Sequence, residues 1–350
     1  MTAGAQEGAA AGTHAAGGKR QAVVRWATTA GVLLVIALLR GDRIAELVGP
    51  GRPVLLQALM TGLLLGGVYG LVSMGLSLIF GVLNIINFAH GAMMTVGMYA
   101  SFLLVANTGL DPYATIVVSV ALLFIIGMAV QKLLINRIMG QPLENQLLLT
   151  LGLAIFIENA LLLAFTGTPR AVQLPYARGL LPLGFTDIQM PFRVFGTVAS
   201  LPRTIAFVGA LVIAAGLYVL LQRTKLGTSI RAVAENPNGA SLVGINVPRI
   251  YVLTFGLGAG CVGAAGVLVL PFLSLEPTTG EMFNILAFVI VVLGGLGSVI
   301  GALLGGLLIG ITQEMGGVIF VGQSKLLPVF IVFILVLFLR PQGLFGKAPE

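Results

Sequence analysis

The chain has 350 residues, of which 57% are hydrophobic and only 9% charged, and its net charge is +7. Because an average soluble domain is about 25% charged, this composition excludes a soluble globular protein and indicates an integral membrane protein. The single cysteine, Cys261, excludes an internal disulfide. The excess of Lys and Arg fits cytoplasmic loops, and no basic patch with interleaved aromatic residues suggests nucleic acid.

The apolar stretches, taken in chain order, predict the helices that cross the membrane. Residues 1–22 are rich in Ala and Gly and predict a disordered cytoplasmic tail. A spanning helix needs about 20 apolar residues, and ten stretches are candidates: 24–40, 54–80, 91–107, 112–135, 147–166, 204–222, 250–272, 282–297, 299–315 and 326–340. The first resembles a signal peptide but has no clear cleavage site, so we expect a retained helix. The glycines of GGLGS (294–298) predict a turn between the eighth and ninth.

The distribution of charge predicts the topology. With the N-terminus in the cytoplasm and ten alternating spans, eleven Lys and Arg lie inside and eight outside, as the positive-inside rule favours. We therefore expect an all-α integral membrane protein. It would be a polytopic bundle of about 8–10 transmembrane helices with broken or re-entrant segments, and both termini would be cytoplasmic. The transmembrane domain would cover 23–347, with a large external loop at 167–203 and an internal loop at 223–249.

The internal loop has the composition of a structured element. Glu235 and Asn236 precede Pro237, which can begin a short second helix. Gly244 would end that helix. A small apolar face among polar neighbours is expected from Ala240, Leu242, Val243 and Ile245. Such an exposed face favours docking of another protein, and the alternative is a helix that rests on lipid headgroups.

A polar segment, NIINFAHGAMM (84–94), stands between two apolar runs. Polar groups at membrane depth are costly unless they face a cavity or each other. Their spacing would place Asn84, Asn87 and His90 along one side of a helix, while Gly81 and Gly91 permit a break. The segment either lines or gates a translocation path, or it forms a short turn in which the asparagines cap helices and His90 lies at the headgroup level.

A second polar pair, Glu158 and Asn159, lies in the predicted span 147–166. A carboxylate in a spanning helix usually faces the bundle interior. Glu158 could bind a substrate ammonium or carry a proton, and the alternative is a structural hydrogen bond between helices. Metal binding by His90 is not expected, since the only other histidine is His14 in the tail. No catalytic triad, carboxylate pair or cofactor motif is present, so the sequence does not indicate an enzyme.

Four motifs together resemble the LivH-type permease of branched-chain amino acid ABC importers, over residues 54–347. They are GLVSMGLSLIFGVLNIINFAHGAMMTVGMYASF, RAVAENPNGASLVGINVPR, VVLGGLGSVIGALLGGLLIG and FLRPQGLFGK. The resemblance implies one of two related permease subunits, the other LivM-like, in the plasma (inner) membrane of a bacterium. It also implies two cytoplasmic ABC ATPase subunits and an extracytoplasmic amino-acid-binding protein. The internal loop would be the coupling loop, and the residues at the family's motif are Arg231, Glu235, Asn236, Gly239, Ala240 and Gly244.

Other transport classes remain open alternatives. A permease of the same family could carry urea or short amides. An autonomous secondary transporter or channel is a further alternative, but it would normally hold more intramembrane ionisable groups than Glu158. The nearest approach to a phosphate-binding GxxxxGK[ST] motif is THAAGGKR (13–20), which lacks the first Gly and the final Ser or Thr. We therefore expect the energy to come from a partner or an ion gradient.

Overall fold

The computed structural model describes residues 52–172, 192–194, 197–320 and 325–346. The predicted tail at 1–22 and the predicted span at 24–40 lie outside these ranges. Within them the chain is almost entirely helical, which confirms the predicted all-α class. The exception is a small antiparallel pair, β1 (Phe192–Val194) and β2 (Thr197–Ala199), inside the predicted external loop.

The described part of the chain contains a helix at each of the predicted spans from 54–80 onward. The helices are α2 (Arg52–Leu83), α3 (His90–Thr108), a stretch from η1 (Pro112–Thr115) through α4 (Ile116–Val130) and η2 (Gln131–Ile135) to α5 (Asn136–Ile138), α6 (Leu143–Phe165), α7 (Leu201–Arg223), α10 (Val247–Val269), α11 (Thr279–Gly294), α12 (Val299–Ile319) and α13 (Leu326–Leu339). Seven of these stretches are long and apolar enough to cross a membrane, whereas α11 and α13 are shorter. The predicted turn at 294–298 separates α11 from α12.

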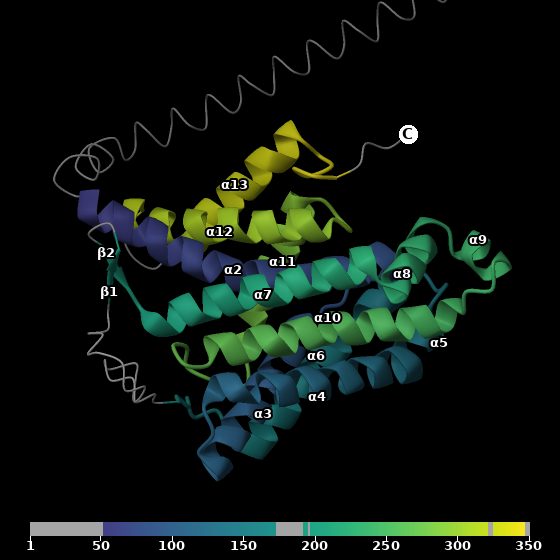
Figure 1. Cartoon of the computed structure of the whole chain (residues 1–350), viewed down its shortest axis with the longest axis horizontal. Helices are drawn as coiled ribbons and strands as arrows, with labels where there is room; N and C mark the ends of the chain where they lie inside the picture. The colour runs from purple at the N-terminus through teal and green to yellow at the C-terminus, as the bar shows by residue number, and fades with distance from the viewer. Residues whose placement is uncertain (1–51, 173–191, 195–196, 321–324, 347–350) are drawn as a thin grey trace, which may run out of the picture.

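The two long loops lie at opposite ends of the bundle (Figure 1). At one end are β1 and β2, next to the start of α2. At the other end, α8 (Lys225–Glu235) and α9 (Pro237–Leu242) project beyond the spanning helices. The described parts of the predicted loops 167–203 and 223–249 therefore lie at opposite ends of the bundle, and their sides of the membrane remain a prediction.

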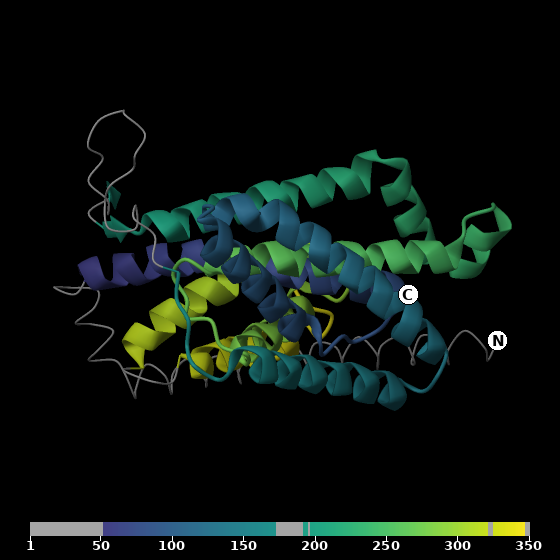
Figure 2. The ribbon, with the colours of Figure 1, turned by 90° about the horizontal axis from the view of Figure 1, so that it is seen from below.

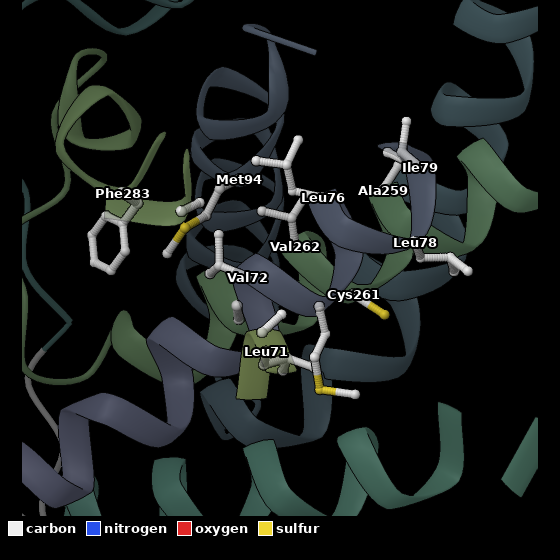
Figure 3. Close-up of a cluster of buried hydrophobic side chains, with 14 of the residues drawn as sticks. Leu71, Val72, Leu76, Leu78, Ile79, Met94, Ala259, Cys261, Val262 and Phe283 are labelled. Atoms are coloured by element: carbon white, nitrogen blue, oxygen red, sulfur yellow. The ribbon is translucent and has the colours of Figure 1, made fainter. Parts of the chain in front are cut away.

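The helices differ in how deeply they are buried. In the most apolar window of each helix, 83% of α2 and of α10 is buried, against 17% of α6 and 28% of α7. Figure 2 shows α6 and α7 along opposite edges of the molecule with α2 and α10 between them. Part of the core appears in Figure 3, where Leu71 and Leu76 of α2 lie beside Val262 of α10. The central helices therefore form the packed core, and the edge helices present apolar side chains outward.

Glycines bring α12 against α2. A Cβ added at Gly62 would lie 2.6 Å from the carbonyl oxygen of Gly310, and one added at Gly66 would lie 2.8 Å from the Cα of Leu307. Lipid supplies no hydrophobic force between helices, so association depends on such close backbone packing. Within the GALLGG sequence of α12, a Cβ added at Gly306 would overlap the backbone of Gly70 in α2, whereas Gly301 and Gly305 pack against α11.

Candidate functional site

The polar segment at 84–90 forms a break between two helices. The helix α2 ends at Leu83, and Asn84 has a φ of +53°, a left-handed conformation that Asn tolerates better than most residues. Residues 84–89 are not helical, and α3 begins at His90. The prediction that Asn84, Asn87 and His90 share one side of a helix is therefore wrong, because the flanking backbone leaves the helical path between them.

The break carries the chain back into the interior of the molecule. The Nε2 atom of His90 lies 3.0 Å from the carbonyl oxygen of Val72 in α2. Val72 precedes Leu83, the last residue of α2, by eleven residues, which corresponds to about 16 Å of helix. His90 is also fully buried. The break therefore turns the chain back into the interior of the bundle, as the expectation of broken or re-entrant segments describes.

The buried amide of Asn87 is only partly satisfied by the break itself. Its Oδ1 atom accepts a hydrogen bond from the backbone N–H of Ala89 at 3.1 Å, which turns the chain toward the first turn of α3. The Nδ2 atom of Asn87 and the Nδ1 atom of His90 are buried and have no hydrogen-bond partner within the described ranges. Buried polar groups are nearly always paired in native structures, so these two atoms mark the break as a polar site inside the bundle.

The amide side chain of Asn284, in α11, forms hydrogen bonds with the backbone next to the break. Its Oδ1 atom accepts from the backbone N–H of Gly91 at 3.2 Å, and its Nδ2 atom donates to the carbonyl of Phe88 at 2.9 Å. Asn284 is not among the residues predicted from the sequence. Its signal was a single amide in the otherwise apolar run MFNILAFVIVV.

The helix α6 contacts the break through one face. The Thr150 hydroxyl donates to the carbonyl of Ile86 at 3.1 Å. One turn further along α6, Ala154 packs in a small apolar cluster with Ala89 and Ala92. The segment is thus enclosed between α2, α6 and α11.

The predicted polar pair on α6, Glu158 and Asn159, lies in two different environments. Glu158 is half-buried, and the like charge of Glu281 in the first turn of α11 acts on it unfavourably. Asn159 is exposed, and its Nδ2 atom donates to the carbonyl of Ile155 in its own helix at 2.8 Å. Only Glu158 remains near the polar groups of α11.

The internal loop is built by local caps. Thr224, Asn236 and Asn246 each accept a backbone hydrogen bond at the start of α8, α9 and α10, which satisfies N–H groups that a helix start leaves unpaired. Asn236 accepts from Gly239 at 2.9 Å, and this confirms the short second helix after Glu235. Gly244, with a φ of +85°, ends the turn that follows.

The apolar face predicted for this loop is smaller than expected. Leu242 and Val243 are 88% and 76% exposed, but Ala240 is buried and Ile245 is half-buried against the core. Two of the four side chains therefore fix the loop, and two are available for contact. A Cβ added at Gly244 would have no neighbour within 4 Å, so the loop is open on that side.

Arg231, an exposed residue of α8, is bonded to the end of α7. Its guanidinium donates to the backbone carbonyl of Leu221 and, at 3.3 Å, to Oε1 of Gln222, both near the end of α7. These contacts fasten α8 to the spanning helix that precedes it.

A cavity of about 650 Å³ lies between the end of α2, α8, the α11–α12 turn and residues 341–346. Asn84, Arg231 and Glu235 all line it. The structure thus brings Asn84 to Arg231 and Glu235 of the internal loop and separates it from Asn87 and His90, which lie deeper. Of the predicted path residues, Asn84 alone lines this cavity with predicted coupling residues.

The C-terminal motif closes one side of the cavity. The backbone N–H groups of Leu344 and Phe345 donate to the carbonyls of Leu293 and Gly294 at 2.8 and 3.2 Å. Gly343 has a φ of +81°, and a Cβ there would lie 2.6 Å from the backbone nitrogen of Gly295. The described part of the FLRPQGLFGK motif is therefore docked on the end of α11, where the GGLGS motif begins.

Comparisons with known proteins agree with this geometry. A family model described as the branched-chain amino acid transport system permease component matches residues 58–339. The branched-chain amino acid permease protein BraD of Pseudomonas aeruginosa is 34% identical over 84% of this chain and 96% of its own length. The permease protein LivH of Escherichia coli is 32% identical over the same shares. A probable LivH permease of Methanocaldococcus jannaschii is 31% identical over 79% of this chain and 88% of its own length.

No solved structure matches the chain. The apolar helices, the re-entrant break and the docked C-terminal motif describe a multi-pass membrane protein. The match extends over almost the whole of its apolar body, and the chain belongs to the family of permease components of branched-chain amino acid transport systems.

Proposed function

We propose that the chain is the membrane-spanning permease subunit of an ATP-driven ABC importer that carries branched-chain amino acids. Its membrane is the plasma (inner) membrane of a bacterium. The observation that carries the proposal is the family match over residues 58–339. Urea or short amides are not favoured as cargo, because the relatives with the widest coverage are named for branched-chain amino acids. In this proposal the chain is not an enzyme, and its partners hydrolyse ATP.

The partners in this proposal are a second, LivM-like permease subunit, two cytoplasmic ABC ATPase subunits and an extracytoplasmic amino-acid-binding protein. The loop α8–α9 is the coupling element. Its capped helices project from the bundle, and Leu242 and Val243 are exposed at its tip. Arg231, Asn236 and Ala240 hold the loop in place, while Gly239 and Gly244 keep its surface open and Glu235 lines the cavity behind it.

The break between α2 and α3 is the gate of the translocation path in this proposal. A zwitterionic amino acid needs one donor for its carboxylate and one acceptor for its ammonium. The unpaired Nδ2 of Asn87 and Nδ1 of His90 supply those two kinds of group. Glu158 supplies a further carboxylate beside α11, and Asn84 lies at the cavity where the path opens. Asn159, exposed and bonded to its own helix, takes no part in the path.

Uptake by the assembled transporter tests this proposal. The chain is reconstituted in liposomes with its partner permease, ATPases and binding protein, and labelled leucine is followed with ATP inside. We expect ATP-dependent accumulation of leucine, isoleucine and valine, with no competition by excess urea or acetamide. If urea or acetamide competes with labelled leucine, and isoleucine and valine do not, the proposed cargo is wrong and the permease carries urea or short amides.

A further inference from the structure

One stripe of α11 contacts the chain where it passes from the break into α3. Gly280, Asn284 and Phe288 are spaced by four residues, so they lie above one another on the same face of the helix. Gly280 meets Gly91, Asn284 bonds both Gly91 and Phe88, and Phe288 packs on Phe88 with ring centroids 4.9 Å apart. The segment that enters α3 therefore runs along two turns of α11.

Asn284 is chemically matched to the break. The non-helical stretch between α2 and α3 leaves backbone donors and acceptors without helical partners. The amide of Asn284 offers one acceptor and one donor group, and it uses the first for the N–H of Gly91 and the second for the carbonyl of Phe88. No other single side chain in the described ranges is shown bonding the break on both sides of His90.

Close packing prevents α11 from sliding past this segment. A Cβ added at Gly91 would lie 2.6 Å from the Cβ of Asn284, and one added at Gly280 would overlap the backbone carbonyl of Gly91. Backbones in such contact move together, because the packed interior is not continuously deformable. A displacement of α11 along its axis therefore displaces the start of α3.

The far end of α11 reaches the coupling region. Its last carbonyls, on Leu293 and Gly294, are bonded by the C-terminal segment. Val292 and Leu296 line the same cavity as Arg231 of α8. A movement of α8 that closes or opens this cavity would therefore displace the end of α11.

We propose that Asn284 is a positioning residue for translocation, which clamps the α2–α3 break to α11 so that movement at the coupling end reaches the gate. This inference rests on the proposed function, since it assigns the gate to the break. Asn284 belongs neither to the predicted path residues nor to the predicted coupling residues. The helix α11 contacts both the break and the cavity beside α8, and such a shared element is the physical requirement for coupling between two sites.

Two substitutions and one control test the clamp in the assembled transporter. Asn284→Leu removes both hydrogen bonds. Asn284→Asp keeps the size of the side chain and the acceptor for Gly91 but removes the donor to Phe88. Asn159→Leu removes a similar amide that bonds only its own helix. For each variant, leucine uptake, ATP hydrolysis and co-purification of the subunits are measured side by side.

We expect both Asn284 variants to assemble and hydrolyse ATP, with leucine transported per ATP falling by about tenfold or more, as small misplacements in active machinery do. The control should keep the wild-type ratio. A wild-type ratio in Asn284→Leu would overturn the proposal. Failure of both Asn284 variants to assemble would also overturn it, because the residue would then serve folding alone.

Hydrogen exchange gives a readout that does not depend on the cargo. In the wild-type complex, addition of ATP should change the exchange of residues 84–94, and in Asn284→Leu that response should be lost while α12 exchanges as before. An ATP response of the break that survives in Asn284→Leu contradicts the clamp. If the wild-type complex carries no branched-chain amino acid, but its ATP response at residues 84–94 is lost in Asn284→Leu, the proposed cargo is wrong and the clamp stands.

Discussion

The break at 84–89 and the loop that contains α8 and α9 are both interruptions between long helices, and both contain Asn residues at their turns. They are held in different ways. The break is buried, and its bonds come from distant residues such as Val72, Thr150 and Asn284. The loop is exposed, and its helix starts are capped from within by Thr224, Asn236 and Asn246.

This difference separates two tasks. An interruption inside a membrane bundle must find partners for its backbone groups from other helices, so its shape depends on where those helices stand. A surface loop with its own caps keeps its shape without them and leaves side chains free for a partner. The break at 84–89 is therefore suited to change shape when the surrounding helices move. The loop that contains α8 and α9 is suited to bind a partner whose movement then shifts those helices.

The largest expected effect of a single substitution is on the buried side of the comparison. In Gly280→Ala the new methyl group would overlap the Gly91 carbonyl and lie 2.6 Å from the Thr95 hydroxyl. We expect a loss of about 3 kcal/mol in the free energy of unfolding, at the upper end for overpacking. Thermal unfolding in detergent measures it.

Gly152→Ala in α6 is the matched control for that substitution, since a Cβ there has no neighbour within 4 Å. It should leave the unfolding midpoint unchanged or raise it slightly, because Ala favours helix over Gly. Equal effects of the two substitutions would show that the contact between Gly91 and Gly280 does not hold the break.

The next largest effect is expected at the tip of the exposed loop. Leu242→Asp places a charge on a side chain that is 88% exposed, so folding should be kept. Its affinity for the ATPase subunits should weaken by about 2 kcal/mol, as at an interface hot spot. Co-purification and uptake-coupled ATP hydrolysis report the loss, with Leu242→Met as the conservative control. Unchanged binding in Leu242→Asp would remove the loop tip from the interface.

A smaller effect is expected from the hydrogen bond between His90 and Val72. His90→Leu removes the donor to the Val72 carbonyl and should cost about 1 kcal/mol, the net value of one such bond. Since the bond sets the depth of the break, exchange of residues 84–94 should rise more than that of α12. His90→Gln, which can donate from its amide, should recover part of the protection. Uniform exchange changes along the chain would contradict a local role.

The smallest effect on the whole molecule is expected at a local cap. Asn236→Ala removes the acceptor for Gly239 and should destabilise α9 by about 1 kcal/mol, without changing the unfolding midpoint of the bundle. Asn236→Asp keeps a capping oxygen and should preserve the helix. Hydrogen exchange of residues 237–242 measures both. A fall in the global midpoint with Asn236→Ala would mean that the loop is not independent of the bundle.

The contrast between local and distant contacts also explains how much of the fold and site could be predicted from the sequence. Apolar length predicted the spans, glycines predicted the turn at 294–298, and Pro237 after Asn236 predicted the start of α9. Each of these depends on neighbours in the chain. The role of Asn284 and the depth of His90 depend on how α11 and α2 stand beside the break. Gly91 and Asn284 are 193 residues apart, and no local pattern carries that register.

The cavity shows the same limit. Asn84 was grouped with Asn87 and His90 because the three are close in sequence, but it lines a cavity with Arg231 and Glu235. The left-handed backbone at Asn84, with a φ of +53°, sends the following residues inward and leaves Asn84 at the end of α2. The spacing alone assumed a continuous helix and could not show this separation.

The most direct test of the account compares the chain alone with the assembled transporter in the same liposomes. The account predicts that leucine accumulates only when the ATPase subunits, the binding protein and ATP are all present, and that Leu242→Asp abolishes that accumulation. Sustained accumulation by the reconstituted chain alone, with an ion gradient and no ATP, would contradict the central claim that a partner drives this permease through α8 and α9.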